Sequence, residues 1–377
     1  MIYKTYGQTG IEVSAVGFGA MRFDDNKNLD VGAELVKNAY DKGINYFDTA
    51  PLYVDDKSEI IVGMAIKEMN KTRAEKPFYV STKSSKATPG EVRENIESSL
   101  KRLNVDYIDF YHFWCIITLE QYEERKANGV LKEFEKLKEE GLIKHICVST
   151  HLVGGDIEKM LGDYPFDGIL LGYSIMNFPY REVGVDAAAK SGKGLVIMNP
   201  LGGGVIPQNP ELFDFVKTQS DETVVEASLR FLINDPRITV ALVGFGNQKH
   251  LDEALRAVDG FKPIDGETVG KIKDSLQENF NDLCTSCQYC DDCPQDIAIP
   301  KIMDIYNHYK LGVGEKDIME RLMWHWGIKL EDNNLGSCTH CGNCEPLCTQ
   351  KLPICERIEF VKNKIDAYLE KQKAKQK

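Results

Sequence analysis

The feature that most restricts the fold is an alternation of short apolar runs with amphipathic stretches between residues 16 and 258. The apolar runs predict buried strands at Val16–Ala20, Ile44–Phe47, Phe78–Ser81, Tyr107–Phe113, Ile143–Ser149, Gly168–Leu171, Gly194–Met198 and Ile238–Leu242. The stretches between them predict helices near 30–42, 57–70, 88–103, 120–140, 154–162, 181–191, 222–234 and 248–258. Strands and helices that alternate in this way favour a closed parallel (β/α)8 barrel, a TIM barrel, in the α/β class. The alternative is a doubly wound open sheet, but no G-x-G-x-x-G sequence follows the first strand.

A short hairpin is expected before the barrel, and a second domain after it. The hairpin would pair Tyr3–Tyr6 with Ile11–Val13 across a turn at Gly7–Gly10. Only Cys115 and Cys147 precede residue 284, although the chain has 11 cysteines. This change in composition predicts a barrel over residues 1–279 and a small, mostly helical domain over residues 280–377, with helices near 297–311 and 315–326 and from residue 355 onward.

Length and charge restrict the partners of the chain. A chain of 377 residues can hold one barrel of about 250 residues and a smaller domain. The net charge of −12 and the lack of a basic stripe argue against a nucleic-acid partner. The first residues lack the apolar core of a signal peptide, and no apolar run reaches about 18 residues. We therefore expect a cytoplasmic protein without a membrane segment.

Three side chains are expected to meet where the barrel strands end. Asp48 follows a strand, Tyr53 lies on the loop beyond it, and Lys83 follows the next strand. The carboxyl ends of barrel strands carry the catalytic groups of such folds. A lysine ammonium would favour the phenolate of Tyr53 and the aspartate would keep the lysine charged, so the tyrosine could pass a proton to a carbonyl oxygen. The alternative is a surface ion pair beside a packing tyrosine.

Several motifs in the same order resemble the aldo-keto reductase family. They are Tyr6–Ser14, Gly17–Arg22, Asn45–Tyr53, Val80–Lys83, Val105–Tyr111 and Lys138–Ser149. The resemblance implies a TIM barrel that uses NAD(P), with Asp48, Tyr53 and Lys83 as catalytic residues. It also implies a nicotinamide contact at Ser149 and phosphate and adenosine loops at Met198–Gly204 and Gly244–Glu253. The cofactor contacts implied in this way are Gly19, Ser149, Leu201, Gly203, Gly244, Asn247, His250 and Glu253.

Two positions depart from the family pattern. The family has a catalytic histidine where this chain has Trp114. His112 lies two residues earlier, so it would face the barrel interior about 6.6 Å deeper unless a bulge shifts the register. It is a candidate catalytic residue or a hydrogen-bonded interior histidine, and His151 is a second candidate near the mouth. The family also has a carboxamide-binding glutamine where this chain has Leu170, and leucine cannot form that hydrogen bond.

The cysteine clusters of the second domain have the spacing of iron–sulfur ligands. Three cysteines with two-residue gaps hold three corners of a four-iron cluster, and in two-cluster ferredoxins the fourth cysteine of each motif binds the other cluster. This rule assigns two ligand sets: Cys284, Cys287, Cys290 and Cys348; and Cys338, Cys341, Cys344 and Cys293. Two structural zinc ions are the alternative. The region resembles the helical ferredoxin-like module of one aldo-keto reductase subgroup, and Cys355 is left over as a buried thiol.

Two functions from different classes follow. One is an oxidoreductase that couples NAD(P)-linked carbonyl reduction or alcohol oxidation in the barrel to single-electron transfer through two four-iron clusters. Its partners would be a small-molecule substrate and a ferredoxin-like or other electron-transfer protein. The other is a non-enzymatic electron-transfer protein or complex subunit whose barrel has lost nicotinamide chemistry, a reading that Trp114 and Leu170 motivate.

Overall fold

The structure, a computed structural model, describes residues 1–25, 27–116, 118–152, 154–175, 178–279, 284, 290–348 and 352–375. Contacts divide the chain into two compact units, Met1–Val269 and Gly270–Lys377. The division falls inside helix α11 (Gly266–Asn279), whereas cysteine composition places a boundary between residues 279 and 280. Composition changes only where this helix ends, and that is why the two boundaries differ.

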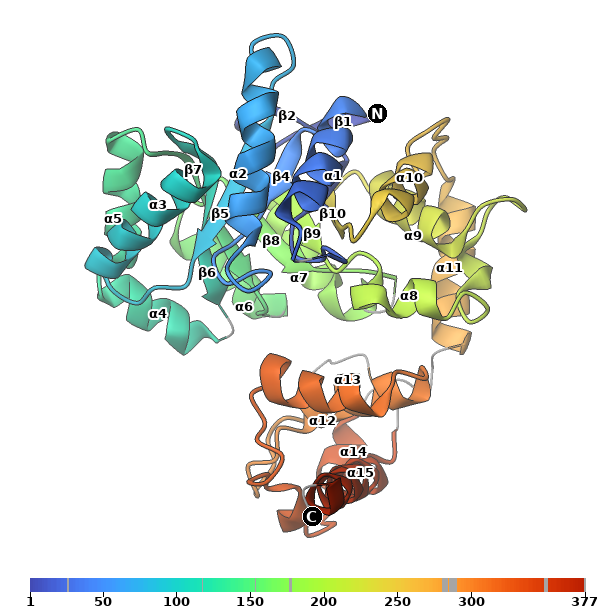
Figure 1. Cartoon of the computed structure of the whole chain (residues 1–377). Coiled ribbons are helices and arrows are strands. Elements are labelled where there is room, and N and C mark those ends of the chain that lie inside the picture. Colours follow the sequence, from blue (N-terminus) through green and yellow to red (C-terminus); the bar gives the residue numbers. More distant parts are fainter. Residues whose placement is uncertain are drawn as a thin grey trace. The chain divides into compact units, whose positions relative to one another are not determined.

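The first unit contains a two-stranded hairpin and a closed barrel. Strands β1 (Tyr3–Thr5) and β2 (Glu12–Ser14) pair in antiparallel fashion. The barrel has the strand order β10-β3-β4-β5-β6-β7-β8-β9, and all neighbours are parallel, which confirms the predicted (β/α)8 fold (Figure 1). Its strands are β3 (Val16–Gly19), β4 (Tyr46–Asp48), β5 (Tyr79–Ser84), β6 (Ile108–Ile116), β7 (Ile143–Thr150), β8 (Gly168–Gly172), β9 (Gly194–Met198) and β10 (Val240–Gly244).

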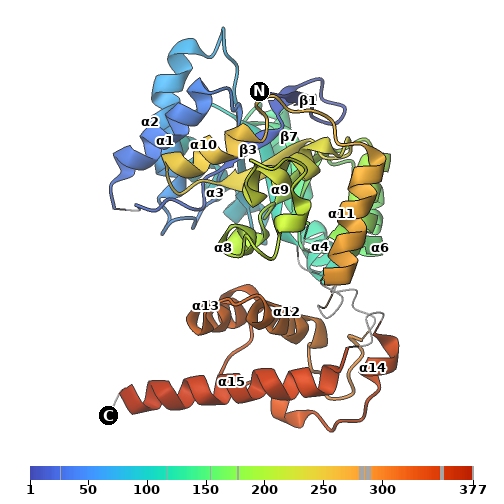
Figure 2. The ribbon, with the colours of Figure 1, turned by 90° about the vertical axis from the view of Figure 1, so that its right-hand side faces the viewer.

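Helices surround the barrel strands (Figures 1 and 2). They are α1 (Leu29–Asp41), α2 (Ser58–Met69), α3 (Pro89–Leu103), α4 (Leu119–Ala127), α5 (Val130–Glu139), α6 (Gly154–Asp163), α7 (Phe178–Lys190), α8 (Val205–Gln208), α9 (Val224–Asn234) and α10 (Gln248–Arg256), with 3-10 turns at Asn70–Thr72, Gly202–Gly204 and Asp214–Val216. The single helix predicted over 120–140 is two helices. Gly129 separates them with a φ of 85°, a left-handed conformation that glycine adopts readily and that ends α4.

Tyr6 fills the end of the barrel at which the strands begin. Its side chain is fully buried, and its ring lies 4.2 Å from that of Phe110 between centroids. A Cβ atom on Gly168 or Gly194, the first residues of β8 and β9, would lie 2.1 Å or 2.3 Å from Tyr6 side-chain atoms. Glycine at both positions therefore makes room for the tyrosine. The candidate catalytic residues lie at the opposite end of the barrel, where the strands finish.

The second unit is helical and has its own apolar core. It contains α12 (Ile299–Lys310), α13 (Glu315–Glu320), a π-helical turn (Arg321–His325), a 3-10 turn (Leu335–Ser337), α14 (Cys344–Leu347) and α15 (Ile354–Lys375). Helix α12 packs on the long α15, and both are labelled in Figure 2. Between them the rings of Tyr306 and Tyr309 contact that of Phe360 edge-on. Asp304 accepts hydrogen bonds from the Arg321 guanidinium and the Trp326 indole. These helices thus hold the cysteine loops on one packed core.

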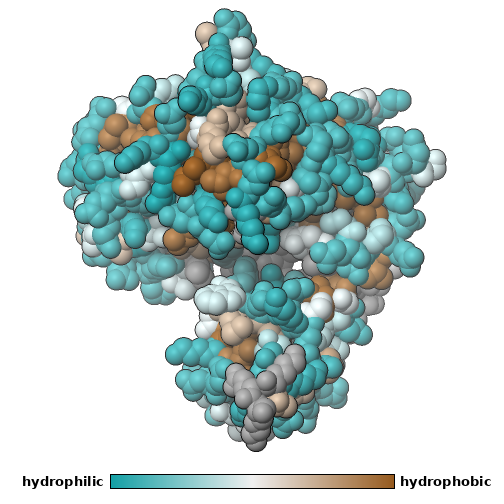
Figure 3. Space-filling model, viewed as in Figure 1, coloured by the Kyte–Doolittle hydropathy of each residue, from teal (hydrophilic) through white to brown (hydrophobic). Residues whose placement is uncertain are grey.

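The surface of the described residues is largely hydrophilic on the face in Figure 3. Apolar side chains gather there over α1 and α2, from which Val31 and Ile60 are 50% and 38% exposed. Among the described residues, no helix combines the length and the apolar character needed to cross a bilayer.

Candidate active site and cysteine pocket

Asp48 and Lys83 form a buried ion pair at the carboxyl ends of β4 and β5. The Lys83 ammonium donates to Asp48 Oδ1 at 2.5 Å and to the Thr49 carbonyl at 2.7 Å. The Ser81 hydroxyl donates to Asp48 Oδ2 at 2.7 Å. Sequence reasoning missed Ser81, although it lies two residues before Lys83 and therefore on the same strand face. Burial lowers the pKa of Lys83 and the Asp48 charge opposes that shift, so the aspartate favours the charged ammonium.

Tyr53 contacts this ion pair through its ring. The Lys83 Nζ atom lies 5.2 Å from the centroid of the Tyr53 ring, within the range of a cation–π contact. Burial raises the pKa of Tyr53 well above 10 and the Asp48 charge raises it further, while Arg22 lowers it. This direction is opposite to the lowering expected from a neighbouring lysine, because the ammonium faces the ring and is engaged by Asp48. At neutral pH the Tyr53 hydroxyl is therefore a protonated phenol that can donate.

The loop that carries Tyr53 has an unusual backbone. Leu52, Val54, Asp55 and Asp56 all have positive φ values, between 53° and 70°. This region is costly for residues with a side chain, above all for a β-branched residue such as Val54. Asp56 Oδ1 accepts hydrogen bonds from the Leu52 amide at 3.1 Å and from Arg102 Nη1 at 2.9 Å. Those bonds help to hold a strained turn next to the candidate proton donor.

His112 lies inside the barrel as expected from its strand position. It pairs with Lys83 across β5 and β6, is fully buried, and neither ring nitrogen forms a well-aligned hydrogen bond within the described residues. Burial lowers the pKa of His112 to about 3, with a further lowering from the Lys83 charge, and the nearby Val148 backbone opposes this only weakly. The imidazole is therefore neutral at physiological pH and carries no proton to donate as a cation.

Trp114, not a histidine, occupies the rim beside Tyr53. Their ring centroids are 5.8 Å apart and the planes meet at 85°, an edge-to-face contact. The register of β6 and β7 shifts between Phe113 and Ile116, beyond His112, so the irregularity leaves the histidine at its interior position. His151 follows β7 directly, and its backbone amide donates to the Ile116 carbonyl at 2.7 Å.

Two interior residues bear on nicotinamide binding. Ser149 on β7 is 1% exposed, and its hydroxyl is among the buried polar groups that have no hydrogen-bond partner within the described residues. A hydroxyl in this state fits a ligand that supplies a polar group, such as a carboxamide. Leu170 pairs with Ser149 across β7 and β8, is 2% exposed and belongs to the apolar interior of the barrel. The residues therefore fit a nicotinamide through Ser149 but not through Leu170.

The remaining candidate cofactor contacts lie on loops at the same rim. Gly19 and Gly244 end β3 and β10 and pair with each other. Beyond β10, the Asn247 side chain caps α10 by accepting from the His250 amide at 3.1 Å, and Glu253 lies on that helix. Leu201 and Gly203 follow β9, in a segment where Gly202, Gly203 and Gly204 have φ values of 62°, 68° and 104°. The structure thus brings the loops after β9 and β10 to the end of the barrel that carries Asp48.

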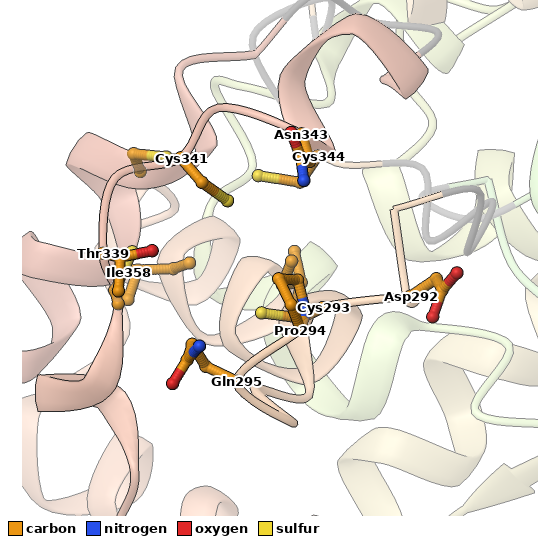
Figure 4. A pocket seen from close by; sticks show the side chains of 12 residues that line it. Asp292, Cys293, Pro294, Gln295, Thr339, Cys341, Asn343, Cys344 and Ile358 are labelled. Atoms are coloured by element: carbon orange, nitrogen blue, oxygen red, sulfur yellow. The ribbon is translucent and has the colours of Figure 1, made fainter.

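One predicted cysteine set lines a single pocket. Cys293, Cys338, Cys341 and Cys344 line it together with Cys355, which sequence reasoning left over. The side chains of Cys293, Cys341 and Cys344 point toward a common space (Figure 4). Such a pocket fits the thiolate set of a four-iron cluster. No group of three or more histidine, cysteine or acidic side chains in the described part of the chain surrounds a point that could hold a single metal ion.

The other predicted set is described in part. Cys290 and Cys348 are buried in the core of the second unit, and Cys284 packs against that core. The Cys284 amide donates to Asn307 Oδ1 at 2.9 Å, and Asn307 Nδ2 donates to the Cys284 carbonyl at 2.8 Å, which ties the cysteine loop to α12. Cys287 lies outside the described residues.

Comparison with known proteins supports both units. Residues 283–353 match the model of the 4Fe-4S dicluster domain, which favours iron–sulfur clusters over structural zinc. The chain is 31% identical to a probable aldo-keto reductase 1 from Glycine max over 209 residues, covering 52% of this chain and 59% of the relative. The chain thus spans less than two thirds of that relative. It is 25% identical to L-galactose dehydrogenase from Arabidopsis thaliana, covering 73% of this chain and 94% of the relative.

Solved structures show the same barrel. A thermostable aldo-keto reductase crystallised with the inhibitor epalrestat has a TM-score of 0.62 at 26% identity, over 73% of this chain and all of that one. An aldo-keto reductase from Bacillus halodurans in its holo form has a TM-score of 0.61 at 22% identity, over 73% of this chain and 96% of that one, which supports the fold. Residues 15–277 match the model of the aldo/keto reductase family. The chain therefore belongs to the aldo/keto reductase family and carries a 4Fe-4S dicluster domain at its C-terminal end.

Proposed function

We propose that the chain is an oxidoreductase that couples NAD(P)-linked carbonyl reduction or alcohol oxidation in the barrel to single-electron transfer through two four-iron clusters. The observation that carries this proposal is the buried Asp48–Lys83 pair beneath the Tyr53 ring, in a family member that also has a dicluster domain. Hydride transfer alone needs no cluster, so the second unit implies the entry or exit of electrons. An electron-transfer protein and a small-molecule carbonyl or alcohol are the proposed partners.

Tyr53 is the proposed proton donor. Its high pKa keeps the phenol protonated, so the hydroxyl can donate a hydrogen bond to a substrate oxygen and then the proton. Lys83 and Asp48 hold fixed charges beside the ring, in a site from which water is largely excluded. A bound NAD(P) would supply the hydride, and Ser149 is the proposed contact to its carboxamide. His112 is proposed to act only as a neutral interior side chain, since its low pKa removes it as a cationic acid.

The proposed cluster ligands are the two crossed cysteine sets. One cluster would be held by Cys284, Cys287, Cys290 and Cys348, and the other by Cys338, Cys341, Cys344 and Cys293. When bound, the clusters would accept and release single electrons. The pocket that gathers the second set supports this assignment. A compartment that keeps thiols reduced suits such ligands, and we propose that the protein works in the cytoplasm.

The test is an anaerobic titration of the purified chain with reduced and oxidised nicotinamide cofactors, followed by a screen of carbonyls and alcohols. Tyr53→Phe keeps the ring contacts to Lys83 and Trp114 and removes the hydroxyl. We expect it to lower kcat by about 10²- to 10⁴-fold, the range usual for a lost general acid. Tyr111→Phe is the matched control, because this ring faces α5 and should leave turnover unchanged. Failure to bind any nicotinamide in the micromolar range would contradict the proposal.

A second candidate function is electron transfer without nicotinamide chemistry. Trp114 against Tyr53 and Leu170 beside Ser149 favour it, since both positions depart from the family pattern. In that case Tyr53→Phe would change no activity, while replacement of the cluster cysteines would abolish reduction of a protein partner. The same variants therefore discriminate between the two candidates.

A further inference from the structure

The cysteine pocket contains one sulfur more than a cluster needs. A four-iron cluster is held by four cysteines, one on each iron. Five cysteines line this pocket, and the proposed ligand set accounts for Cys293, Cys338, Cys341 and Cys344. The fifth is Cys355, and its role is unassigned by the spacing rules that define the two ligand sets.

Cys355 is held firmly in the pocket wall. It is the second residue of α15 and is 8% exposed. Its backbone amide donates to Glu345 Oε1 at 3.1 Å, which joins the start of α15 to α14. Its side chain lies within hydrogen-bonding reach of Cys344 and near Cys338. The neighbouring Leu352, Ile354 and Ile358 are buried in the core of the unit, so the start of this helix is fixed by packing.

Cys341, a proposed ligand in the same pocket, differs from Cys355 in its exposure to solvent. It is exposed, whereas Cys344 is buried and Cys293 and Cys338 are half-buried. It also lies in a loop between His340 and Gly342, whose φ values are 51° and 73°. An exposed thiolate on a surface loop is the ligand that oxidants and solvent reach first. The pocket thus combines a vulnerable ligand with a protected spare thiol.

We propose that Cys355 is a reserve ligand that takes the place of Cys341 in the second cluster. This inference rests on the proposed ligand sets. In the exchange, the bond between Cys341 and its iron breaks and Cys341 takes up a proton, while Cys355 loses its proton and binds the same iron. Protons balance, and no atom changes its oxidation state. After the exchange, oxidation or alkylation of the released Cys341 thiol leaves the cluster in place, and in a Cys341 variant Cys355 supplies the fourth thiolate from the start.

The test compares the iron content of anaerobically purified full-length variants. The wild type and Cys355→Ala should each hold about eight irons, the content of two four-iron clusters. Cys341→Ala should also hold about eight, whereas Cys341→Ala/Cys355→Ala should fall to about four. Electron paramagnetic resonance of the reduced proteins should show a perturbed second cluster in Cys341→Ala and only one cluster in the double variant. Cys341→Val, which also supplies no ligand, gives the same comparison if the alanine variant does not fold.

A matched control uses a proposed ligand outside this pocket. Cys348 does not line it, so Cys348→Ala should lose the same amount of iron whether Cys355 is present or replaced. Equal iron loss in Cys341→Ala and the double variant would overturn the reserve role. Iron loss in Cys355→Ala alone would also overturn it, because Cys355 would then be an ordinary ligand. A wild-type protein without iron would overturn the proposed function itself and the reserve role with it.

Discussion

Replacement of His112 by leucine should make the barrel more resistant to acid. His112 is fully buried beside Lys83, and its pKa is lowered from 6.5 to about 3. In the unfolded chain the same histidine titrates near 6.5, so the unfolded state binds the proton between these two values. Protonation then favours unfolding, and the stabilising contribution of His112 is complete above pH 6.5 and is lost as the pH falls. Leucine removes this titration and is of similar size.

The magnitude follows from the size of the shift. One pKa unit corresponds to about 1.4 kcal/mol, so the loss of unfolding free energy caused by His112 would reach about 5 kcal/mol near pH 3. At pH 5 the linkage relation gives a loss of about 2 kcal/mol relative to pH 8. Asp109 acts in the opposite direction, because burial raises the pKa of its carboxyl to about 6. Asp109 is present in both proteins, so the comparison between wild type and variant cancels its effect.

The assay is urea unfolding of the full chain at pH 8 and pH 5. Circular dichroism reports both units, because the second unit is helical, whereas visible absorbance of the clusters reports the second unit alone, so the barrel transition is the part of the circular dichroism change that the absorbance does not follow. The wild-type barrel should lose about 2 kcal/mol more than the His112→Leu barrel between the two pH values. His250→Asn, which replaces an exposed histidine, should behave as the wild type. An equal loss in wild type and His112→Leu would refute the reasoning, since it would show that His112 titrates alike in both states.

Three further changes test the strain and packing of the barrel unit. Val54→Gly should raise the unfolding free energy by about 1 kcal/mol in urea titrations, because glycine adopts the φ of 56° without the cost that a β-branched residue incurs; a lower value would show that Val54 is unstrained. Gly168→Ala should lower it by about 1–3 kcal/mol through overpacking against Tyr6, and Tyr6→Phe in the same chain should recover part of the loss; no recovery would place the strain elsewhere. Arg230→Met should lower the unfolding free energy by about 3–5 kcal/mol, because Glu222, whose Oε2 lies 2.7 Å from Arg230 Nη1, would remain buried without its cationic partner; a calorimetric melt that is unchanged would contradict this.

The pairing of Asp48 with Lys83 could be anticipated because parallel strands end at one edge of a barrel. Both residues follow apolar runs, and the two strands are neighbours in the barrel. The predicted fold was therefore sufficient to predict that the two side chains meet. The direction in which the Lys83 ammonium points could not be predicted from the sequence. Whether it faces the phenol oxygen or the ring of Tyr53 depends on loop residues with left-handed backbone, which propensity and periodicity do not encode.

Around Tyr53, the strand period predicts some side-chain positions and not others. A strand period of two places His112 in the interior correctly, and the register with Lys83 agrees. The same period cannot locate the irregularity between Phe113 and Ile116, so the edge-to-face contact of Trp114 with Tyr53 was not foreseen. The helix break at Gly129 did have a local signal, since Asn128-Gly129 is a common turn dipeptide. The position of Cys355 had no local signal in the sequence. The spacing of the cysteines predicts the ligands within each motif, but it gives no information on the helix that brings Cys355 to the pocket.

The number of electrons links the two chemistries within the proposed function. A hydride carries two electrons, whereas a four-iron cluster passes them singly. Two clusters in one chain together hold as many electrons as one hydride delivers, so the oxidation or reduction of one bound nicotinamide by the clusters would fill or empty both. Loss of either cluster would then leave one electron without an acceptor and stop the coupled reaction, while uncoupled carbonyl reduction by NAD(P)H would continue. In the proposed function the exposed Cys341 would be the vulnerable ligand, and Cys355, which lines the same pocket, would protect the two-electron capacity as the reserve ligand.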